Sequence, residues 1–190
     1  MNKLYALRTD IMKVDPRQLR NCLGHFATGV TVITTEVDGH PHGATVNSFT
    51  AVSLDPALVL VSLDRRTKTC GYLEDRPFTV NLLREPQDDV ALHFAGKPRT
   101  EPIEWERGEL GPRLPGSLAY VACTPWRSYD GGDHVLFLGK VEEFEFTGGD
   151  PLVFYLGEFR HLGQAFESVP WLESADCPST LDFSWLRPAS

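Results

Sequence analysis

Strand-like segments follow one another closely through most of this chain, with little room for helices between them. Candidates rich in Val, Ile, Thr and aromatic residues lie at 30–37, 58–63, 78–83, 117–124, 134–146 and 152–156, and another begins near Ala44. Such runs, separated by turn signals such as Asp38-Gly39, are typical of strands. Strands at this spacing favour a closed or nearly closed β-barrel over a βαβ sheet, so we expect a mainly β fold with flanking helices.

One of these segments reads as the centre of the sheet. Residues 58–63 are apolar on both faces except at Ser62. A strand without alternation is typical of one that is covered on both sides. We therefore expect a central, doubly covered strand here.

Three helices are expected around the strands. The first runs over 16–29, because Asp15 is a good N-cap, Pro16 suits the first turn and Gly29 suits the end. Its apolar residues recur at helical spacing and predict one buried stripe: Leu19, Cys22, Leu23, Phe26 and Ala27. Short helices are expected at 68–74, after the Thr67 hydroxyl, and at 88–94. Residues 96–116 read as a long loop anchored by Ile103 and Trp105.

Composition narrows the class of protein. The 190 residues contain 18 Lys and Arg against 26 Asp and Glu, a net charge of −8, which argues against a nucleic-acid or anionic-membrane partner. No segment has the length and hydropathy of a membrane span or a signal peptide. Four widely spaced cysteines without a CxxC pair favour reduced thiols in a cytoplasmic protein. Cys22 and Cys123 fall at apolar positions and are expected to pack. We expect one domain over residues 1–163. We expect the tail over residues 164–190 to pack on the barrel or on a dimer partner.

Several common catalytic signatures are missing from the sequence. It has no GxGxxG before a helix, no Walker A motif and no GxSxG elbow. His40 and His42 have the spacing of two metal ligands on one strand face, but no third ligand accompanies them. We therefore interpret them as polar residues in a turn around Pro41 and expect no metal site.

The first candidate site is a polar run within a strand. Thr45, Val46, Asn47 and Ser48 bring small donors and acceptors to a segment that should belong to the barrel wall. Together with the backbone they could hydrogen-bond a planar heterocycle. The alternative is a solvent-exposed strand face, and taken alone this run favours that alternative.

The second candidate lies between the 58–63 strand and the next helix. It brings hydroxyls and cations together within a few residues: Ser62, Leu63, Asp64, Arg65, Arg66, Thr67, Lys68 and Thr69. Free N–H groups at a helix start, assisted by hydroxyl and cationic side chains, bind phosphate well. The alternative is a capped helix with solvated basic residues. Because the chain is otherwise acidic, we favour phosphate binding.

The third candidate is the turn Gly131-Gly132-Asp133-His134. Two glycines allow a sharp turn and leave room above the backbone, and His134 follows at the start of a strand. A histidine beside such a turn could contact a ligand at the barrel rim. Most lone histidines are structural or surface residues, and the residues alone leave both interpretations open.

In this order the segments resemble the flavin reductase-like family of FMN-binding split barrels. The matching pieces are 26–34 (FATGVTVIT), 43–56 (GATVNSFTAVSLDP), 58–64 (LVLVSLD), 78–83 (FTVNLL), 93–95 (HFA), 132–141 (GDHVLFLGKV), 151–155 (PLVFY) and 157–162 (GEFRHL). The resemblance covers about residues 15–163. It implies a Greek-key split barrel and a homodimer with its flavin cleft near the subunit interface.

The resemblance also assigns roles to individual residues. It implies that the segment at Thr45–Ser48 contacts the isoalloxazine ring, that the Ser62–Thr69 segment holds the phosphate, and that Phe94 and Ala95 line the flavin. His134 would lie near the flavin and the nicotinamide entrance. The implied function is an NAD(P)H-dependent flavin reductase that passes reduced FMN or FAD, by diffusion, to a partner monooxygenase. NADH and NADPH both remain possible donors.

Two other functions remain open at this point. The chain could retain its flavin and act on another substrate, because the unusual 96–116 loop or the aromatic tail could close the cleft. It could also be a non-enzymatic flavin-binding or electron-transfer module without a nicotinamide site.

Overall fold

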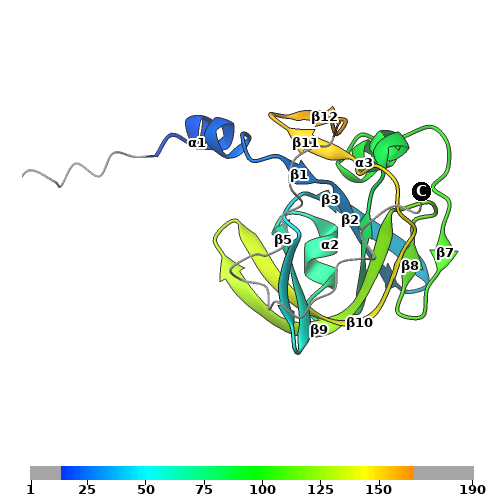
Figure 1. Ribbon diagram of the computed structural model, residues 1–190. Coiled ribbons are helices and arrows are strands. Elements are labelled where there is room, and N and C mark those ends of the chain that lie inside the picture. Colours follow the sequence, from blue (N-terminus) through cyan, green and yellow to red (C-terminus); the bar gives the residue numbers. More distant parts are fainter. Residues whose placement is uncertain (1–13, 165–190) are drawn as a thin grey trace, which may run out of the picture.

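The computed structural model describes residues 14–164 and is built around one curled antiparallel sheet of seven strands (Figure 1). The strands are β2 (Thr31–Val37), β3 (His40–Val46), β4 (Thr50–Leu54), β5 (Ala57–Asp64), β6 (Phe78–Leu82), β9 (Ala119–Gly131) and β10 (His134–Phe146). Their order is β3-β2-β6-β9-β10-β5-β4. The edge strands β3 and β4 do not pair with each other, so the barrel is split there, as the family resemblance implied.

Smaller elements surround this sheet. A three-stranded sheet contains β1 (Thr28–Gly29), β11 (Val153–Tyr155) and β12 (Glu158–Arg160), and a short hairpin contains β7 (Glu106–Arg107) and β8 (Pro112–Arg113). The helices are α1 (Pro16–Leu23), α2 (Lys68–Tyr72) and α3 (Asp88–Phe94), with a 3-10 turn at Glu85–Gln87. Helix α2 contacts β2, β3 and β5 and thereby lies across the opening of the split sheet. Among the described residues no helix is long and apolar enough to cross a membrane.

The β2–β3 hairpin shows why the predicted turn forms. Asp38 and Gly39 both adopt positive φ angles, of 52° and 76°, between the paired ends Val37 and His40. Two successive left-handed residues match the twist of a two-residue hairpin, and an Asp-Gly pair adopts them at low cost. This turn fixes the register that places the polar run of β3 at the far end of the strand.

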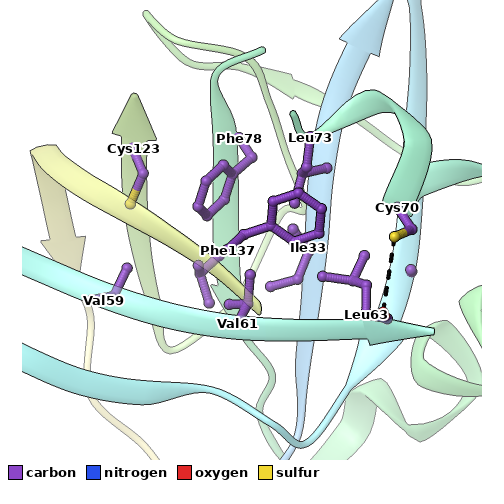
Figure 2. Packing of buried hydrophobic residues seen from close by; sticks show 11 residues of the cluster. Ile33, Val59, Val61, Leu63, Cys70, Leu73, Phe78, Cys123 and Phe137 are labelled. Atoms are coloured by element: carbon purple, nitrogen blue, oxygen red, sulfur yellow. Dashed lines mark hydrogen bonds between the residues drawn. The ribbon is translucent and has the colours of Figure 1, made fainter. Parts of the chain in front are cut away.

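Side chains from both walls of the barrel meet in one apolar core (Figure 2). Ile33 of β2, Phe78 of β6 and Phe137 of β10 point into it, and Val61 of β5 closes it from the opposite wall. Cys123 is fully buried here, which confirms its expected packing role. Burial raises the pKa of its thiol to about 12. A second cluster, which includes Val32 and Leu114, packs with α3.

The prediction that residues 58–63 are covered on both faces was wrong. In β5 the side chains of Val59, Val61 and Leu63 are buried, whereas Leu58 and Leu60 are only half-buried. Strand β5 lies in a barrel wall between β10 and the edge strand β4. Only its inner face meets the core, so the continuous apolar run does not correspond to two covered faces.

The first helix also differs from its prediction. Asp15 caps it as expected, with its carboxylate accepting from Arg17 N at 2.8 Å, but the helix ends at Leu23 and Gly24 is its C-cap. The chain leaves the helix because Thr28 and Gly29 pair with β11. No residue of α1 is buried, so the predicted buried stripe is wrong within this chain, and Cys22 is exposed rather than packed.

Other differences are smaller. Strand β9 continues past its predicted end at 124 to Gly131, because residues 125–131 pair with β10 although most of their side chains are exposed. His40 and His42 lie on β3, and the His42 ring packs against Tyr72 with centroids 4.9 Å apart. Ile103 and Trp105 anchor the 96–116 segment as predicted. The tail beyond Gln164 lies outside the described residues.

Candidate active site

A pocket of about 520 Å³ opens where the ends of β3 and β5 meet the C-terminus of α3 and the start of β10. It gathers most of the residues singled out from the sequence. Its lining consists of Ala44, Thr45, Val46, Asn47, Ser48, Ser62, Leu63, Asp64, Thr67, Phe94, Ala95, Gly96 and His134. Three segments that are far apart in the sequence therefore form one concave surface.

The polar run of β3 forms one wall of the pocket. The Thr45 hydroxyl donates to Ala91 O at 2.7 Å and ties β3 to α3. The Ser48 hydroxyl donates to Ser62 O at 2.7 Å and accepts from Ser62 N at 3.2 Å, which ties β3 to β5. Asn47 is exposed, and its amide makes no side-chain hydrogen bond within residues 14–164. The two hydroxyls therefore hold the walls together and leave the Asn47 amide available to a ligand.

The turn between β5 and α2 forms the second wall. The Thr67 hydroxyl donates to Asp64 O at 2.8 Å and accepts from Cys70 N at 3.3 Å, so it caps α2 as the sequence predicted. The Asp64 carboxylate accepts from Arg66 Nε at 3.0 Å and from Arg66 N at 2.8 Å. These bonds with Arg66 hold the pKa of Asp64 well below its usual range. Asp64, the one acidic member of the predicted segment, thus brings negative charge to this wall.

The other predicted phosphate contacts lie outside the pocket lining. Arg65 donates from Nε to Gly132 O at 2.8 Å and forms an ion pair with Asp130, so it binds the β9–β10 turn. The Lys68 side chain is exposed, whereas Thr69 is buried. Of the selected segment, the structure brings Ser62, Leu63 and Thr67 into the pocket and places Arg65, Lys68 and Thr69 beside it.

His134 stands at the rim of the pocket. It is the first residue of β10, it pairs in register with Asp64 of β5, and its side chain is about two-fifths exposed. Its Nδ1 lies 2.7 Å from the carboxylate of Asp133, and this hydrogen bond lowers the pKa of Asp133. The backbone N–H of Arg65 also donates to Asp133 O at 3.1 Å. The turn at Gly132–His134 is thus hydrogen-bonded to the β5–α2 turn, and His134 lies where the two turns meet.

The third wall comes from the end of α3. Phe94 lines the pocket and packs edge-on against Trp105, with ring centroids 5.8 Å apart. Ala95 is the C-cap of α3, and Gly96 follows with a positive φ of 92°. Trp105 belongs to the long 96–116 segment, so that segment supports the pocket from behind.

The pocket suits a planar, partly polar ring system. Its volume lies within the range of about 300–1,000 Å³ typical of sites for small ligands. Val46, Leu63 and Phe94 provide apolar surface, while the Asn47 amide and the Thr67 hydroxyl provide polar groups at the rim. These residues fit a flavin, because its ring has two apolar faces and a hydrogen-bonding edge. The described residues hold no cluster of three His, Cys, Asp or Glu side chains for a metal ion.

The same segments carry a family match. Residues 23–163 match the model of the flavin reductase like domain. The chain belongs to this family. A relative from a Rhodococcus species, an NADH-dependent flavin reductase, is 43% identical over 84% of this chain and 93% of its own length. The reductase subunit HsaB of a flavin-dependent monooxygenase from Mycobacterium tuberculosis is 42% identical over 77% of this chain and 82% of its own.

Solved structures agree with this assignment. The flavin reductase PheA2 superimposes with a TM-score of 0.77 at 38% identity, covering 80% of this chain and all of that one. The NADH:FAD oxidoreductase SgcE6 of Streptomyces globisporus, in complex with NAD and FAD fragments, gives a TM-score of 0.73 at 36% identity, with 79% and 96% covered. The split-barrel fold expected from the sequence is confirmed.

Proposed function

We propose that this chain is an NADH-dependent flavin reductase that supplies reduced flavin to a separate monooxygenase. The pocket carries this proposal, because it brings the polar run of β3, the β5–α2 turn and His134 into one open site in a member of the flavin reductase-like family. Relatives named as NADH-dependent reductases and as monooxygenase reductase components support both the donor and the downstream partner.

The residues of the chain bind and orient the reactants. A flavin in this pocket would supply the redox chemistry by accepting a hydride from the nicotinamide of NADH. Val46, Leu63 and Phe94 would hold the ring by its apolar faces, and the Asn47 amide would bind its polar edge, while the Ser48 hydroxyl keeps the two walls together. Thr67 and Lys68 would bind the phosphate side, and Arg65 would hold the β9–β10 turn beside it through Gly132 and Asp130. Because the reacting rings need only close stacking, positioning supplies most of the rate.

His134 is proposed as the residue that seats the nicotinamide. Its place at the rim leaves one ring nitrogen for a ligand, because Nδ1 is engaged by Asp133. Replacing His134 with Ala should raise the KM for NADH and leave the KM for flavin nearly unchanged. Unchanged NADH kinetics would exclude this role.

The cellular setting follows from the same proposal. Reduced flavin is expected to leave the open pocket and diffuse to its oxygenase. The enzyme is proposed to work as a homodimer in the cytoplasm, where NADH is produced. The free thiols Cys22, Cys70 and Cys123 suit a reducing compartment.

One steady-state comparison tests the proposal against its alternatives. Purified protein is dialysed and then assayed with NADH or NADPH against FMN, FAD and riboflavin, with and without oxygen. We expect loss of yellow colour on dialysis and rapid NADH oxidation on addition of free flavin. Flavin retained through dialysis, with no reduction of added flavin, would favour a flavoprotein acting on another substrate. Flavin binding without any NAD(P)H oxidation would favour an electron-transfer module.

A further inference from the structure

Arg65 lies beside the candidate flavin pocket without lining it. It comes directly after β5, and its side chain is 43% exposed. The resemblance places it on the phosphate side of the flavin, because it belongs to the 62–69 segment. Its contacts run instead to the turn between β9 and β10. We call residues 130–134 the histidine turn.

Arg65 and Asp130 hold Gly132 from both sides. Arg65 Nε donates to Gly132 O at 2.8 Å, and Gly132 N donates to the Asp130 carboxylate at 3.0 Å. The same carboxylate accepts from the Arg65 guanidinium, which closes a ring of interactions around this peptide unit. The backbone N–H of Arg65 also donates to Asp133 O at 3.1 Å. Both polar backbone groups of Gly132 are therefore bonded to this pair of side chains.

The histidine turn needs such contacts because its own residues restrain it little. Gly132 has a positive φ of 79°, and a Cβ atom there would meet nothing within 4 Å. A glycine loses more conformational freedom on folding than any other residue, so its place depends on the hydrogen bonds that hold it. The backbone of His134 is paired with β5, but its imidazole is oriented by the carboxylate of Asp133, 2.7 Å from Nδ1. The turn therefore sets the orientation of the imidazole.

We propose that Arg65 is a positioning residue for His134 and belongs to the nicotinamide side of the site rather than to its phosphate side. The edge of the guanidinium that could hold a phosphate through two parallel bonds is already occupied by Gly132 and Asp130. Lys68 is exposed and forms no ion pair within residues 14–164, so its ammonium group stays open to a phosphate. This inference rests on the proposed function, in which His134 seats the nicotinamide.

Steady-state kinetics separate the two sides of the site. In Arg65→Ala we expect kcat/KM for NADH to fall roughly tenfold, because a displacement of about 1 Å in a positioning group can cost about a hundredfold in rate. The KM values for FMN and for riboflavin should stay nearly unchanged. Arg127→Ala is the matched control, because it removes an exposed arginine of β9 that does not line the pocket. Unchanged NADH kinetics, or a KM that rises for FMN and not for riboflavin, would overturn the proposal.

Two further variants show whether Arg65 acts through His134. Arg65→Lys keeps the positive charge but cannot hold Gly132 and Asp130 together through a planar fork, so it should lose activity with NADH as Arg65→Ala does. In a His134→Ala background, Arg65→Ala should cost nothing further, because the residue that it positions is gone. Full activity of Arg65→Lys would indicate that Arg65 attracts NADH by charge alone. Additive losses in the double variant would indicate a role independent of His134, and either result would overturn the proposal.

Nuclear magnetic resonance of the imidazole tests the proposal without flavin or NADH. The ring signals of His134, assigned by their loss in His134→Ala, should shift in Arg65→Ala and stay in place in Arg127→Ala. Asp130→Asn, which keeps an oxygen for Gly132 N but removes the charge that holds the guanidinium, should shift them as well.

Unshifted His134 signals in Arg65→Ala and Asp130→Asn would overturn the proposal. Failure of the proposed function is distinguishable, because a wild-type protein that oxidises no NADH would still show these shifts when Arg65 is replaced. If circular dichroism shows that Arg65→Ala does not fold, Arg65→Lys and Asp130→Asn take its place in the kinetic and the resonance measurements.

Discussion

The ring of Phe94 lies directly on the backbone of Gly43. A Cβ atom at Gly43 would come 2.7 Å from Cδ1 of Phe94 and 3.2 Å from Cγ1 of Val32. The glycine therefore lets α3 approach β3 closely enough for Phe94 to form a wall of the candidate flavin pocket. The position of Phe94 therefore depends on the absence of a Cβ atom at residue 43.

Gly43→Ala should displace Phe94 toward the pocket. We expect the KM for flavin to rise several-fold and the free energy of unfolding to fall by about 1–3 kcal/mol, the usual cost of overpacking. Gly71→Ala is the matched control, because a Cβ there meets nothing within 4 Å. Steady-state kinetics and urea unfolding of both variants check this. An unchanged KM in Gly43→Ala would show that Phe94 does not shape the site.

Ser48→Ala should loosen the junction between β3 and β5. The variant loses both hydrogen bonds to the Ser62 backbone, one donated and one accepted. Each is worth about 0.5–1.5 kcal/mol, so we expect stability to fall by about 1–3 kcal/mol and flavin binding to weaken. Ser128→Ala on exposed β9 is the control. Equal stability of the two variants would contradict the account.

Lys68→Ala should distinguish flavins by their phosphate. We expect the KM for FMN to rise about three- to tenfold through loss of a charged contact, and the KM for riboflavin, which lacks phosphate, to stay the same. Arg66→Ala is the neighbouring control, because its guanidinium is already held by Asp64. Steady-state kinetics of both variants with FMN and with riboflavin test this prediction. An equal rise in the KM for riboflavin would show that Lys68 does not bind the flavin phosphate.

Stability should decline at high pH because of Cys123. Its folded-state pKa is raised to about 12, so above pH 9 the unfolded thiol ionises while the folded thiol stays protonated. Stability from this group is therefore complete below pH 9 and is lost as pH rises toward 12, by about 1.4 kcal/mol per pH unit. Urea unfolding at pH 8 and pH 10 should show wild type losing more stability than Cys123→Ala. Equal losses would contradict the burial effect.

Much of the fold was predictable because local chemistry determines it. The Asp38-Gly39 turn, the Thr67 cap of α2 and the bounds of α3 and β10 match their predictions, since each depends on residues adjacent in sequence. Helix α1 was predicted less well. Its helical spacing indicates an apolar side, but only the tertiary structure shows that the body of the same chain does not cover it.

The site was predictable in part for the same reason. The β3 run and the β5–α2 turn line one pocket, and the flavin contacts that the resemblance assigns to them stay a prediction. Sequence reasoning could not foresee that Asp130 and Asp64 engage Arg65 and Arg66. These ion pairs depend on a turn more than sixty residues away and on side-chain geometry. Counting nearby cations therefore overstated the positive charge open to a ligand.

Anaerobic turnover of free flavin tests the central claim most directly. Protein at about one-hundredth of the FMN concentration is mixed with excess NADH, and the flavin absorbance is followed. We predict bleaching of the whole FMN pool, because reduced flavin leaves the open pocket and another oxidised molecule enters. Bleaching that stops at one flavin per protein, or no bleaching at all, would contradict it.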